Sequence, residues 1–557
     1  MAAAPRPGRL LSPKARYRGP MPPSARDWQE LREAAGGSLL QDEESRERFA
    51  TDESIYRVLP LAVVAPQGAE GVAAVLRFAS QHRVPVTARA GGTSLAGQAV
   101  GPGIILDLSR QFERILEIDA AAGWVEVEPG VVLAELNGAL AGHGKQFGPD
   151  PSSFESCRVG GMVGNNASGM HHRIWGAVVD NVLGLTLLLA NGERIRTSPV
   201  ELGSRRYKDL CAPDTLEARL YREVPPIIER LRSGQAASPW PRVEKSSSGY
   251  RLDKALEGGV FDLGKLVCGS EGTLAIVLSA RLRVVDRPPA KGLLVLYFGS
   301  LKDAARGVTE SLSTGASAVE MIDERVVEAM RKRAPKDAAR FRSDTRAVLF
   351  VEYMGKDLPE VEARMEGGWR RLREETGLAV DDQATTDPST MEDLWRIRRG
   401  VEPLLSEVGG SRAPVGFVED TAVPVERLAE HVEGLYAIFE RHGLKAAAYG
   451  HASTGHLHIR PYLDLSRPED RALMATVAGE VFDHTRRLGG TLSGEHGDGL
   501  LRSEFLASFF GEAYDAMVEI KRLFDPLGIL NPGKKTHAVP GQIARNLRPR
   551  APSGPRV

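Results

Sequence analysis

The chain has 557 residues, a formal net charge of −1, 42% hydrophobic residues and 26% charged residues. This length predicts two or three domains around large buried cores, and the near-neutral charge gives no indication of a nucleic-acid groove or a polybasic membrane surface. The longest apolar run, Val182–Ala190, is too short to span a bilayer. The three widely separated cysteines exclude a CxxC redox pair and an iron–sulfur ligand set, and they do not suggest a disulfide framework.

Both ends of the chain are rich in proline and arginine. Residues 1–26 contain six Arg or Lys residues and six Pro residues, and no acidic residue precedes Asp27. Prolines at this density oppose the amphipathic helix of a transit peptide, so a disordered leader is favoured over a targeting segment. We expect a partly disordered N-terminal extension over residues 1–50 and a disordered tail over residues 538–557.

From about Ser54 to Pro288, short β-rich runs alternate with glycine turns. The expected strands cover residues 61–65, 84–88, 103–108 and 124–128. Apolar positions at helix spacing predict a helix over residues 69–81. Together these patterns predict a glycine-rich α+β domain over residues 51–288.

Paired prolines at residues 288–289 mark a domain boundary, because they end a strand and stiffen the connection that follows. The elements expected after this boundary are strands over residues 293–298, 318–322 and 348–352 and a helix over residues 302–313. This alternation of strands and helices predicts a second, α/β domain over residues 289–500.

Three glycine-rich loops in the first domain offer clusters of backbone N–H groups. They cover residues 88–98, 148–170 and 269–276, and the first loop follows an expected strand directly. Backbone N–H groups and hydroxyls on such loops bind anions such as phosphate. One loop of this kind is more often a plain turn, but three in one domain favour a ligand site. None is a Walker A loop or a GxGxxG after a first strand, so neither a nucleotidase nor a Rossmann dehydrogenase is indicated.

In their order and spacing, these loops resemble the FAD-binding domain of the vanillyl-alcohol-oxidase and p-cresol-methylhydroxylase (PCMH) flavoproteins. Within that group the chain resembles the FAD-linked D-2-hydroxyacid dehydrogenases, which include D-lactate and D-2-hydroxyglutarate dehydrogenases, from about Tyr56 to Lys535. The resemblance implies an α+β fold with a PCMH-type FAD-binding domain and an α/β cap domain for the substrate. It also implies that a C-terminal helical segment over residues 501–537 packs on the FAD domain and returns to the flavin.

The resemblance further implies which residues surround the FAD. The loop at residues 91–95 would hold the pyrophosphate, and residues 271–276 would lie beside the adenine end. The implied cofactor-binding residues are Ala90, Gly91, Gly92, Thr93, Ser94, Leu95, Gln98, Pro149, Asp150, Gly160, Gly161, Asn165, Ala167, Ser168, Gly169, Glu271, Ile276 and Asn531. Nothing in the spacing of His171 and His172 demands a covalent linkage, so we expect non-covalent FAD.

Four of the twelve histidines lie in two glycine-rich segments, residues 450–460 and 490–499. Alternate side chains of an extended strand share one face, so His456, His458 and Arg460 would face the same side. Buried, hydrogen-bonded histidines are commoner than metal ligands, but the nearby pair Glu495 and His496 favours a metal site. Two imidazoles and one carboxylate leave an open coordination position, which is typical of a catalytic divalent-metal site.

The family resemblance divides this cluster into roles. It implies metal ligands at His451, His458 and Glu495, with zinc as the expected ion, and a catalytic base at His496. The base would take the hydroxyl proton of a 2-hydroxy acid while the Cα hydride passes to flavin N5. His456 stands where many relatives carry asparagine, and we assign it to substrate binding or to a structural role.

Two arginines are candidates for binding the carboxylates of the substrate. Arg398 matches the arginine that relatives use for this purpose, and the alternative for it is a solvated basic helix face. Arg460 is a candidate for a distal carboxylate because of its strand face. Relatives specialised for 2-hydroxyglutarate often carry a lysine where Val418 stands here, so the sequence leaves open which D-2-hydroxy acid is the substrate.

These features predict an FAD- and metal-dependent D-2-hydroxyacid dehydrogenase that passes electrons to an acceptor other than NAD. The expected acceptors are a quinone, a cytochrome, a separate iron–sulfur protein or an electron-transfer flavoprotein, with oxygen left open. One alternative is a transferase like alkylglycerone-phosphate synthase, which tends to have histidine where this chain has Glu495, and another is a non-catalytic flavin subunit of a larger complex. We expect a cytoplasmic chain without nucleic-acid partners, and leave open peripheral membrane association and homodimer formation.

Overall fold

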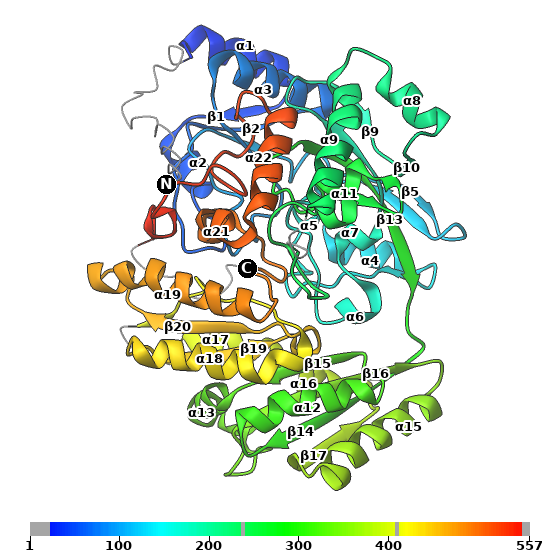
Figure 1. Ribbon diagram of the computed structural model, residues 1–557, viewed down its shortest axis with the longest axis vertical. Coiled ribbons are helices and arrows are strands. Elements are labelled where there is room, and N and C mark those ends of the chain that lie inside the picture. Colours follow the sequence, from blue (N-terminus) through cyan, green and yellow to red (C-terminus); the bar gives the residue numbers. More distant parts are fainter. Residues whose placement is uncertain (1–22, 235–239, 407–411, 549–557) are drawn as a thin grey trace, which may run out of the picture.

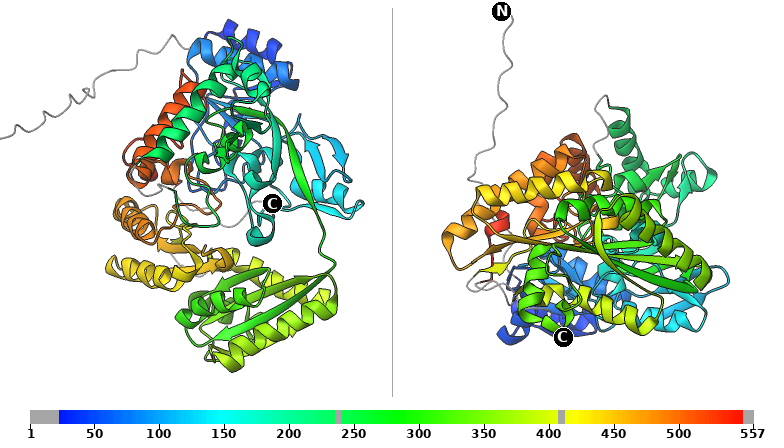
Figure 2. Two further views of the ribbon diagram at one scale, coloured as in Figure 1. Left: turned by 45° about the vertical axis from the view of Figure 1, so that its right-hand side comes forward. Right: turned by 90° about the horizontal axis from the view of Figure 1, so that it is seen from below.

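The computed structural model describes residues 23–234, 240–406 and 412–548. Residues 1–22 and 549–557, where we expected a disordered leader and tail, lie outside the described residues. Two domains are stacked along the long axis of the molecule (Figure 1), and an extended connection joins them after β13 (Ile276–Asp286), as Figure 2 also shows. The second domain begins at β14 (Ala290–Phe298), so the paired prolines lie in this connection.

The first domain contains two main sheets. One sheet has four strands in the order β1-β2-β4-β3, of which β2, β4 and β3 are parallel. The other has six antiparallel strands in the order β5-β6-β13-β8-β9, with β7 also paired to β13. The remaining strands of the domain are β1 (Ser38–Leu40), β2 (Ala62–Ala65), β3 (Val86–Arg89), β4 (Ile104–Asp107), β5 (Ile115–Asp119), β6 (Trp124–Val127), β7 (Lys145–Phe147), β8 (Val182–Leu188), β9 (Arg194–Arg196), β10 (Val200–Glu201), β11 (Leu256–Glu257) and β12 (Val260–Phe261).

The helices of the first domain use apolar stripes to cover these sheets. The predicted helix over residues 69–81 is α3, and its buried Val72 and Val75 share a core with Val86 and Ile104 of the parallel sheet. The helices are α1 (Ala25–Ala35), α2 (Glu43–Arg48), α3 (Gly68–His82), α4 (Leu133–Ala141), α5 (Val159–Asn165), α6 (His172–Trp175), α7 (Val178–Asn181), α8 (Arg205–Cys211), α9 (Leu216–Ser233), α10 (Leu252–Ala255), α11 (Leu263–Val267), α20 (Gly499–Arg502), α21 (Leu506–Phe510) and α22 (Glu512–Phe524).

Segments at both ends of the described chain pack on the first domain, although we expected disorder there. Within the predicted N-terminal extension, α1 buries Leu31 in the core that α3 forms, and β1 pairs with β2. In the predicted tail, Ile543 is fully buried, and its carbonyl oxygen accepts a hydrogen bond of 2.9 Å from Tyr56 Oη. The expectation of disorder is therefore wrong for residues 538–548, because this segment buries apolar surface and pairs its backbone.

The second domain is a seven-stranded antiparallel sheet with helices on both faces. The strand order is β17-β14-β16-β15-β19-β20-β18. Alternate residues of β14 enter two separate cores: Leu294 and Leu296 share one with α12 and α15, whereas Leu293 and Val295 share the other with α13 and α16. The expected alternation of helices and strands is present, and all the strand pairings are antiparallel.

The elements of the second domain follow the predicted strands and helix within a few residues. The strands after β14 are β15 (Ala318–Ile322), β16 (Ala347–Gly355), β17 (Ala379–Thr385), β18 (Ala413–Pro414), β19 (Ala446–Gly450) and β20 (His458–Leu463). The helices are α12 (Leu301–Ser313), α13 (Glu324–Arg333), α14 (Pro335–Ala338), α15 (Leu358–Trp369), α16 (Pro388–Arg399), α17 (Val401–Ser406), α18 (Leu428–Arg441) and α19 (Pro468–Arg487).

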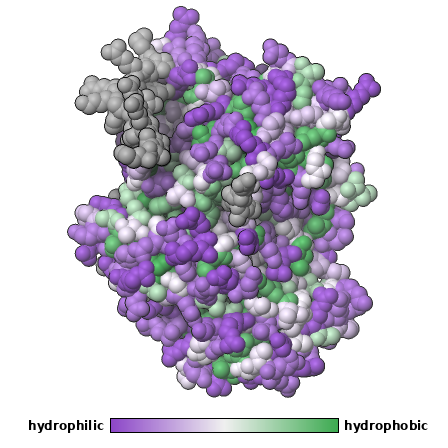
Figure 3. Space-filling view, in the orientation of Figure 1, coloured by the Kyte–Doolittle hydropathy of each residue, from purple (hydrophilic) through white to green (hydrophobic). Residues whose placement is uncertain are grey.

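The surface is mostly hydrophilic on the face shown in Figure 3, with hydrophobic residues scattered singly or in small groups. Scattered apolar residues are normal on the surface of folded proteins. Among the described helices, none has both the length and the apolar run that crossing a membrane requires.

His171, directly before α6, joins the two domains through charged groups. Its Nδ1 lies 2.5 Å from Asp150 Oδ2 in the first domain, and its Nε2 lies 2.7 Å from Glu352 Oε1 on β16 of the second. Burial lowers the pKa of His171, but the two carboxylates outweigh burial and raise that pKa from 6.5 to about 9. Lys291 Nζ also faces Glu352, at 3.5 Å, and the Trp175 ring packs against His171.

The His171 bridge predicts a pH-dependent contribution to stability. Because its folded pKa of about 9 exceeds the value of 6.5 for the free side chain, the stabilisation is fully present below pH 6.5 and is lost as pH rises through about 9. The melting temperature of His171→Gln should therefore lie furthest below wild type at about pH 6, with a gap that narrows as pH rises toward 9. The exposed His143→Gln serves as control. A gap for His171→Gln that stays constant across this range would contradict the charged bridge.

Candidate active site

A cavity of about 1660 Å³ lies between the two domains, and both contribute to its wall. The glycine loops line it from the first domain, while residues of α16, β19 and β20 line it from the second. Pockets for small ligands commonly measure about 300–1,000 Å³. This cavity therefore has room for a large cofactor and a small substrate together.

Most of the predicted cofactor-binding residues lie in the cavity wall. Those that line it are Ala90, Gly91, Gly92, Thr93, Ser94, Leu95, Gln98, Asp150, Gly160, Gly161, Asn165, Ala167, Ser168 and Glu271. Those that lie behind the wall are Pro149, Gly169, Ile276 and Asn531. The three loops, which are far apart in the sequence, thus form one continuous surface.

The loop after β3 and the loop after α5 fit a cofactor such as FAD. A Cβ atom at Gly91 would lie 2.8 Å from the Ser156 carbonyl oxygen, and Gly92 has a φ of +71°, which favours glycine. Asn165 Oδ1 and Ser168 Oγ are buried in the wall and have no hydrogen-bond partner among the described residues. Buried polar atoms rarely stay unpaired. A cofactor with phosphates and polar rings would satisfy both atoms.

Asn531 braces the loops instead of lining the cavity. Its Nδ2 donates to the carbonyl oxygens of Gln98 and Glu271 at 3.0 and 2.7 Å, and its Oδ1 accepts from Thr87 Oγ1 and Lys534 Nζ. Because the amide is fully used inside the protein, the predicted direct contact of Asn531 with the cofactor is not supported. The side chain holds the C-terminal segment against two of the glycine loops.

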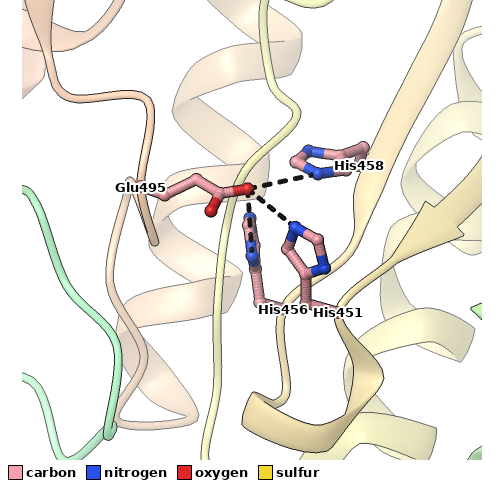
Figure 4. A group of neighbouring side chains, drawn as sticks. All are labelled: His451, His456, His458 and Glu495. Atoms are coloured by element: carbon pink, nitrogen blue, oxygen red, sulfur yellow. Dashed lines mark ion pairs between the residues drawn. The ribbon is translucent and has the colours of Figure 1, made fainter. Parts of the chain in front are cut away.

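Three histidines converge on one carboxylate oxygen (Figure 4). Glu495 Oε1 lies 3.0 Å from His451 Nε2, 3.5 Å from His458 Nε2 and 3.9 Å from His456 Nδ1. All four residues are buried, and their possible ligand atoms lie within 4.8 Å of one another. An ion with ligand bonds of about 2.1 Å would hold neighbouring donor atoms about 3.0–3.4 Å apart. The distance from His451 lies in this range and that from His458 just above it, whereas His456, at 3.9 Å, exceeds it by about 0.5 Å. One divalent ion therefore fits this donor set after a small shift of the His456 side chain.

A second group of possible ligand atoms includes Asp420 and His496 in addition to His458 and Glu495. The Asp420 carboxylate already accepts hydrogen bonds of 3.0 Å from the backbone N–H groups of Glu495 and His496, and one from the Ser493 hydroxyl. A carboxylate that is occupied in this way is a poor ligand. The group of three histidines and Glu495 has the freer donor atoms.

Sequence reasoning missed a buried lysine beside this cluster. Lys245, in the loop between α9 and α10, is fully buried, and its Nζ lies 2.6 Å from Glu495 Oε2. This contact leaves Glu495 Oε1 turned toward the histidines. Burial raises the pKa of Glu495, but Lys245 and then His451 hold it well below its usual range. No local sequence pattern indicated Lys245. Its loop reaches Glu495 through long-range contacts, such as the hydrogen bond of 2.9 Å that Ser247 N–H donates to the Ser493 carbonyl oxygen.

Acidic residues that the sequence analysis did not assign lie behind the histidines. Glu320 Oε1 lies 2.5 Å from His451 Nδ1, and Glu419 Oε1 lies 2.9 Å from His496 Nδ1. For Glu320 a signal was present, because it is the one charged residue in the apolar, fully buried strand β15. Burial raises its pKa, but His451 and Arg398 lower that pKa to about 2, so Glu320 is a carboxylate.

His496, the predicted base, lies in the cavity wall. Its ring stacks on His458 with centroids 4.9 Å apart and planes at 9°. Burial lowers its pKa, but Asp420 and Glu419 outweigh burial and raise the pKa to about 9. Because Glu419 holds Nδ1, the geometry leaves Nε2 as the nitrogen that can exchange a proton with a ligand.

The two predicted arginines differ in what they can offer a substrate. Arg398 is 12% exposed, so it does not lie on a solvated helix face; its Nη2 pairs with Glu320 at 2.6 Å, while its Nε is buried without a hydrogen-bond partner among the described residues. Arg460 pairs through Nε with Glu419 at 2.7 Å and through Nη1 with Glu402. Two acids thus compensate the charge of Arg460, and a distal-carboxylate role for it is not favoured.

The predicted substrate contact of His456 is contradicted by its position. His456 is fully buried and lies behind Glu495, outside the cavity wall. A Cβ atom at Gly494 would lie 2.9 Å from its ring, so the two segments pack tightly there. Val418, where some relatives carry lysine, is also buried behind the wall.

A buried ion network joins the glycine loops to the segment that carries Glu495 and His496. Lys535 Nζ lies 2.7 Å from Asp498 Oδ2 and 3.1 Å from Glu271 Oε1. Glu271 in turn accepts hydrogen bonds from the backbone N–H groups of Asp498 and Gly499, at 2.6 and 2.9 Å. Gln98 Nε2 donates to the carbonyl oxygen of His496. These contacts fix His496 relative to two of the loops that line the cavity.

Comparisons with known proteins agree with this architecture. Residues 60–198 match the sequence model of the FAD binding domain, and residues 287–535 match that of the C-terminal domain of FAD linked oxidases. The D-2-hydroxyglutarate dehydrogenase of Pseudomonas putida is 35% identical over 512 residues, which cover 89% of this chain and 50% of that protein. The D-lactate dehydrogenase of Archaeoglobus fulgidus is 29% identical over 498 residues, which cover 87% of this chain and 95% of that protein.

Solved structures share the fold at low sequence identity. The structure of p-cresol methylhydroxylase with bound substrate superposes with a TM-score of 0.65 at 14% identity, covering 93% of this chain and 98% of that chain. This likeness confirms the predicted PCMH-type fold. The chain spans about half the length of the D-2-hydroxyglutarate dehydrogenases that it matches.

The two matches and the PCMH-type fold show that the chain contains both the FAD binding domain and the C-terminal domain of the FAD linked oxidases, with the cavity lined by glycine loops between them. The prediction that it binds FAD is supported by the match to the FAD binding domain. Within the family, its resemblance to the FAD-linked D-2-hydroxyacid dehydrogenases is confirmed by the identities to the Pseudomonas and Archaeoglobus proteins.

The Lys535 network should be essential for stability. The variant Lys535→Met leaves Glu271 and Asp498 buried without their cation, and removing one partner of a buried ion pair costs about 3–5 kcal/mol. We expect a lower melting temperature and weaker retention of FAD, measured by thermal unfolding and flavin fluorescence. In the control variant Lys302→Met, the lost partner is Glu433 in a pair exposed on both sides. Exposed pairs contribute less than about 1 kcal/mol, so equal losses in the two variants would refute the importance of the network.

Proposed function

We propose that the chain is an FAD- and divalent-metal-dependent dehydrogenase that oxidises a D-2-hydroxy acid to the 2-keto acid. One observation carries this proposal. The glycine loops of the first domain and the group formed by His451, His458 and Glu495 line the same cavity, and His496 lies in its wall. A hydroxy acid between them would have its hydroxyl group near a base and its Cα–H bond near a hydride acceptor. The names of the sequence relatives support this class of substrate.

Arg398 is the residue that we assign to the substrate carboxylate. It lines the cavity and keeps an unused Nε donor, and its guanidinium lies over the Tyr449 ring at 5.1 Å from the centroid. A planar guanidinium binds a carboxylate through paired N–H donors. The pair between Arg398 Nη2 and Glu320 holds the guanidinium in place.

His496 is the residue that we assign to the hydroxyl proton. A base must be neutral to accept a proton, and with a pKa of about 9 the free imidazole is largely protonated at neutral pH. A nearby positive charge favours the neutral form. Glu419 fixes the ring through Nδ1, so that Nε2 is the nitrogen left to accept the proton.

The remaining chemistry comes from groups that these residues would hold. FAD supplies a two-electron acceptor, and a divalent ion bound by His451, His458 and Glu495 supplies Lewis-acid stabilisation of negative charge on the hydroxyl oxygen. Glu495 also bears on the alternative of a transferase like alkylglycerone-phosphate synthase, because such enzymes tend to have histidine there. A carboxylate at this position is consistent with a metal ligand, because Lys245 holds Oε2 while Oε1 faces the histidines.

The proposal predicts stereospecific reduction of the flavin. Purified protein that contains FAD and metal, mixed anaerobically with D- and L-lactate and with D- and L-2-hydroxyglutarate, should lose its yellow absorbance with D enantiomers only. Metal analysis of the same sample, before and after chelation, should link the rate to the bound ion. If no hydroxy acid bleaches the flavin, the dehydrogenase proposal fails. Bleaching at an unchanged rate in metal-free protein would remove the ion from the mechanism.

The assignment of the base predicts separable losses. His496→Ala should keep its FAD and bound metal but reduce the flavin about 100- to 10,000-fold more slowly, the usual contribution of a general base. The wild-type rate should rise with pH as His496 becomes neutral, over a range at or below pH 9, and this rise should be absent in the variant. His143→Ala, at an exposed position, should match wild type. Loss of flavin from His496→Ala would show that the residue has a structural role instead.

A further inference from the structure

His456 is a buried histidine that the proposed set of metal ligands does not include. It precedes β20 and follows Gly455, whose φ of +66° turns the chain back toward Glu495. The side chain has no solvent exposure and does not line the cavity. It therefore cannot contact a substrate, and its role has to come from the residues around it.

Neither ring nitrogen of His456 has a hydrogen-bond partner among the described residues. Its Nε2 lies 2.8 Å from Asp420 Oδ1 without hydrogen-bond geometry, and its Nδ1 faces Glu495 Oε1 at 3.9 Å. Leaving a buried polar atom unpaired is costly. A partner for Nδ1 would have to lie in the space between this nitrogen and Glu495, where the other two histidines also point (Figure 4).

The three histidines share one arrangement, in which a carboxylate lies behind each ring and Glu495 Oε1 lies in front. His451 has Glu320 at 2.5 Å from Nδ1 and Glu495 at 3.0 Å from Nε2. For His456, the carboxylate behind the ring is Asp420. The same holds for His458, with Glu419 3.7 Å from Nδ1 and Glu495 3.5 Å from Nε2. Histidines that bind metals commonly donate their other ring N–H to a carboxylate, which fixes the tautomer and makes the ligating nitrogen a better donor. His451 makes this hydrogen bond to Glu320, whereas Asp420 and Glu419 lie near the rings of His456 and His458 without one.

We propose that His456 is the fourth protein ligand of the metal, so that the donor set is three imidazoles and one carboxylate. This inference rests on the metal site of the proposed function and extends it. Four protein donors fill a tetrahedral ion completely, as in structural zinc sites. The site therefore needs an ion that accepts five or six ligands if a substrate is to bind it, with the open positions on the cavity side, where His451 and His458 lie.

His496 is the competing candidate for a fourth ligand, because its Nε2 lies 3.8 Å from Glu495 Oε1. Two observations favour His456. The ring of His496 lies in the cavity wall and is held by a hydrogen bond to Glu419, whereas both nitrogens of His456 lack such a bond among the described residues. The possible ligand atoms of His456 also form one mutually close group with His451, His458 and Glu495, whereas His496 groups with His458 and Glu495 only together with Asp420, whose carboxylate already accepts hydrogen bonds.

The test counts the nitrogen ligands directly and measures affinity independently of activity. FAD-loaded protein freed of metal is titrated with Cu²⁺ for electron paramagnetic resonance and with Zn²⁺ in competition with a chelator. In the copper spectra we expect three coupled nitrogens in wild type and in His496→Asn, and two in His456→Asn. The Zn²⁺ dissociation constant of His456→Asn should rise at least about 100-fold, which exceeds the usual loss when a residue that only contacts a metal ligand is replaced. His431→Asn is the matched control, because His431 is equally buried and has an unpartnered Nδ1 on α18, away from the cluster.

The possible outcomes separate this inference from the proposed function. Three nitrogens in wild type, with one lost only in His456→Asn, would establish the fourth ligand. Two nitrogens in wild type, or three that include His496, would overturn the inference and leave the metal site standing. Absence of ion binding in wild type would overturn both the metal site and the fourth ligand, whereas the flavin-reduction experiment tests the dehydrogenase activity separately. If His456→Asn does not fold, the wild-type count and the His496→Asn count still decide the question.

Discussion

The pairing of buried Lys535 with Glu271 and Asp498 is the interaction on which the arrangement of the site depends. An ammonium group without solvent exposure is tolerated only when carboxylates and carbonyls surround it, and here they come from three distant parts of the chain. Glu271 belongs to a glycine loop, Asp498 follows the predicted base, and Lys535 ends the returning C-terminal segment. Because separating these buried charges is costly, they keep the cofactor loops and the segment that carries His496 in a fixed relative position.

The same principle organises the second half of the site. Glu495 has one oxygen held by Lys245 and the other facing three histidines, and each histidine has a further carboxylate behind it. Lys245 belongs to the first domain, whereas the histidines belong to the second. The buried charges of the cluster are therefore not neutralised within either domain alone, and the cluster is complete only where the two domains meet. This explains why the chain buries so many ionisable groups beside one cavity.

Local sequence patterns predicted the elements but not their long-range partners. The helix over residues 69–81 and the strands over residues 318–322 and 348–352 follow from periodicities that local geometry dictates, and they were found within a few residues. The packing of residues 538–548 was not predictable in this way. That segment contains only the short 3-10 helix Gln542–Ala544, and its order comes from partners such as Tyr56, far away in the sequence.

At the site, strand alternation predicted which face a side chain uses but not what it meets there. His458 and Arg460 do share a face, yet Glu419 and Glu402 neutralise Arg460, so the predicted distal-carboxylate contact loses its support. His456 approaches the same Glu495 oxygen as His458, but from the buried side, because the turn at Gly455 precedes it. Whether a buried polar group is available to a ligand depends on the acids and bases that other segments bring to it. For this cavity those groups are Lys245, Glu320 and Glu419, and no short motif links them to the histidines that they control.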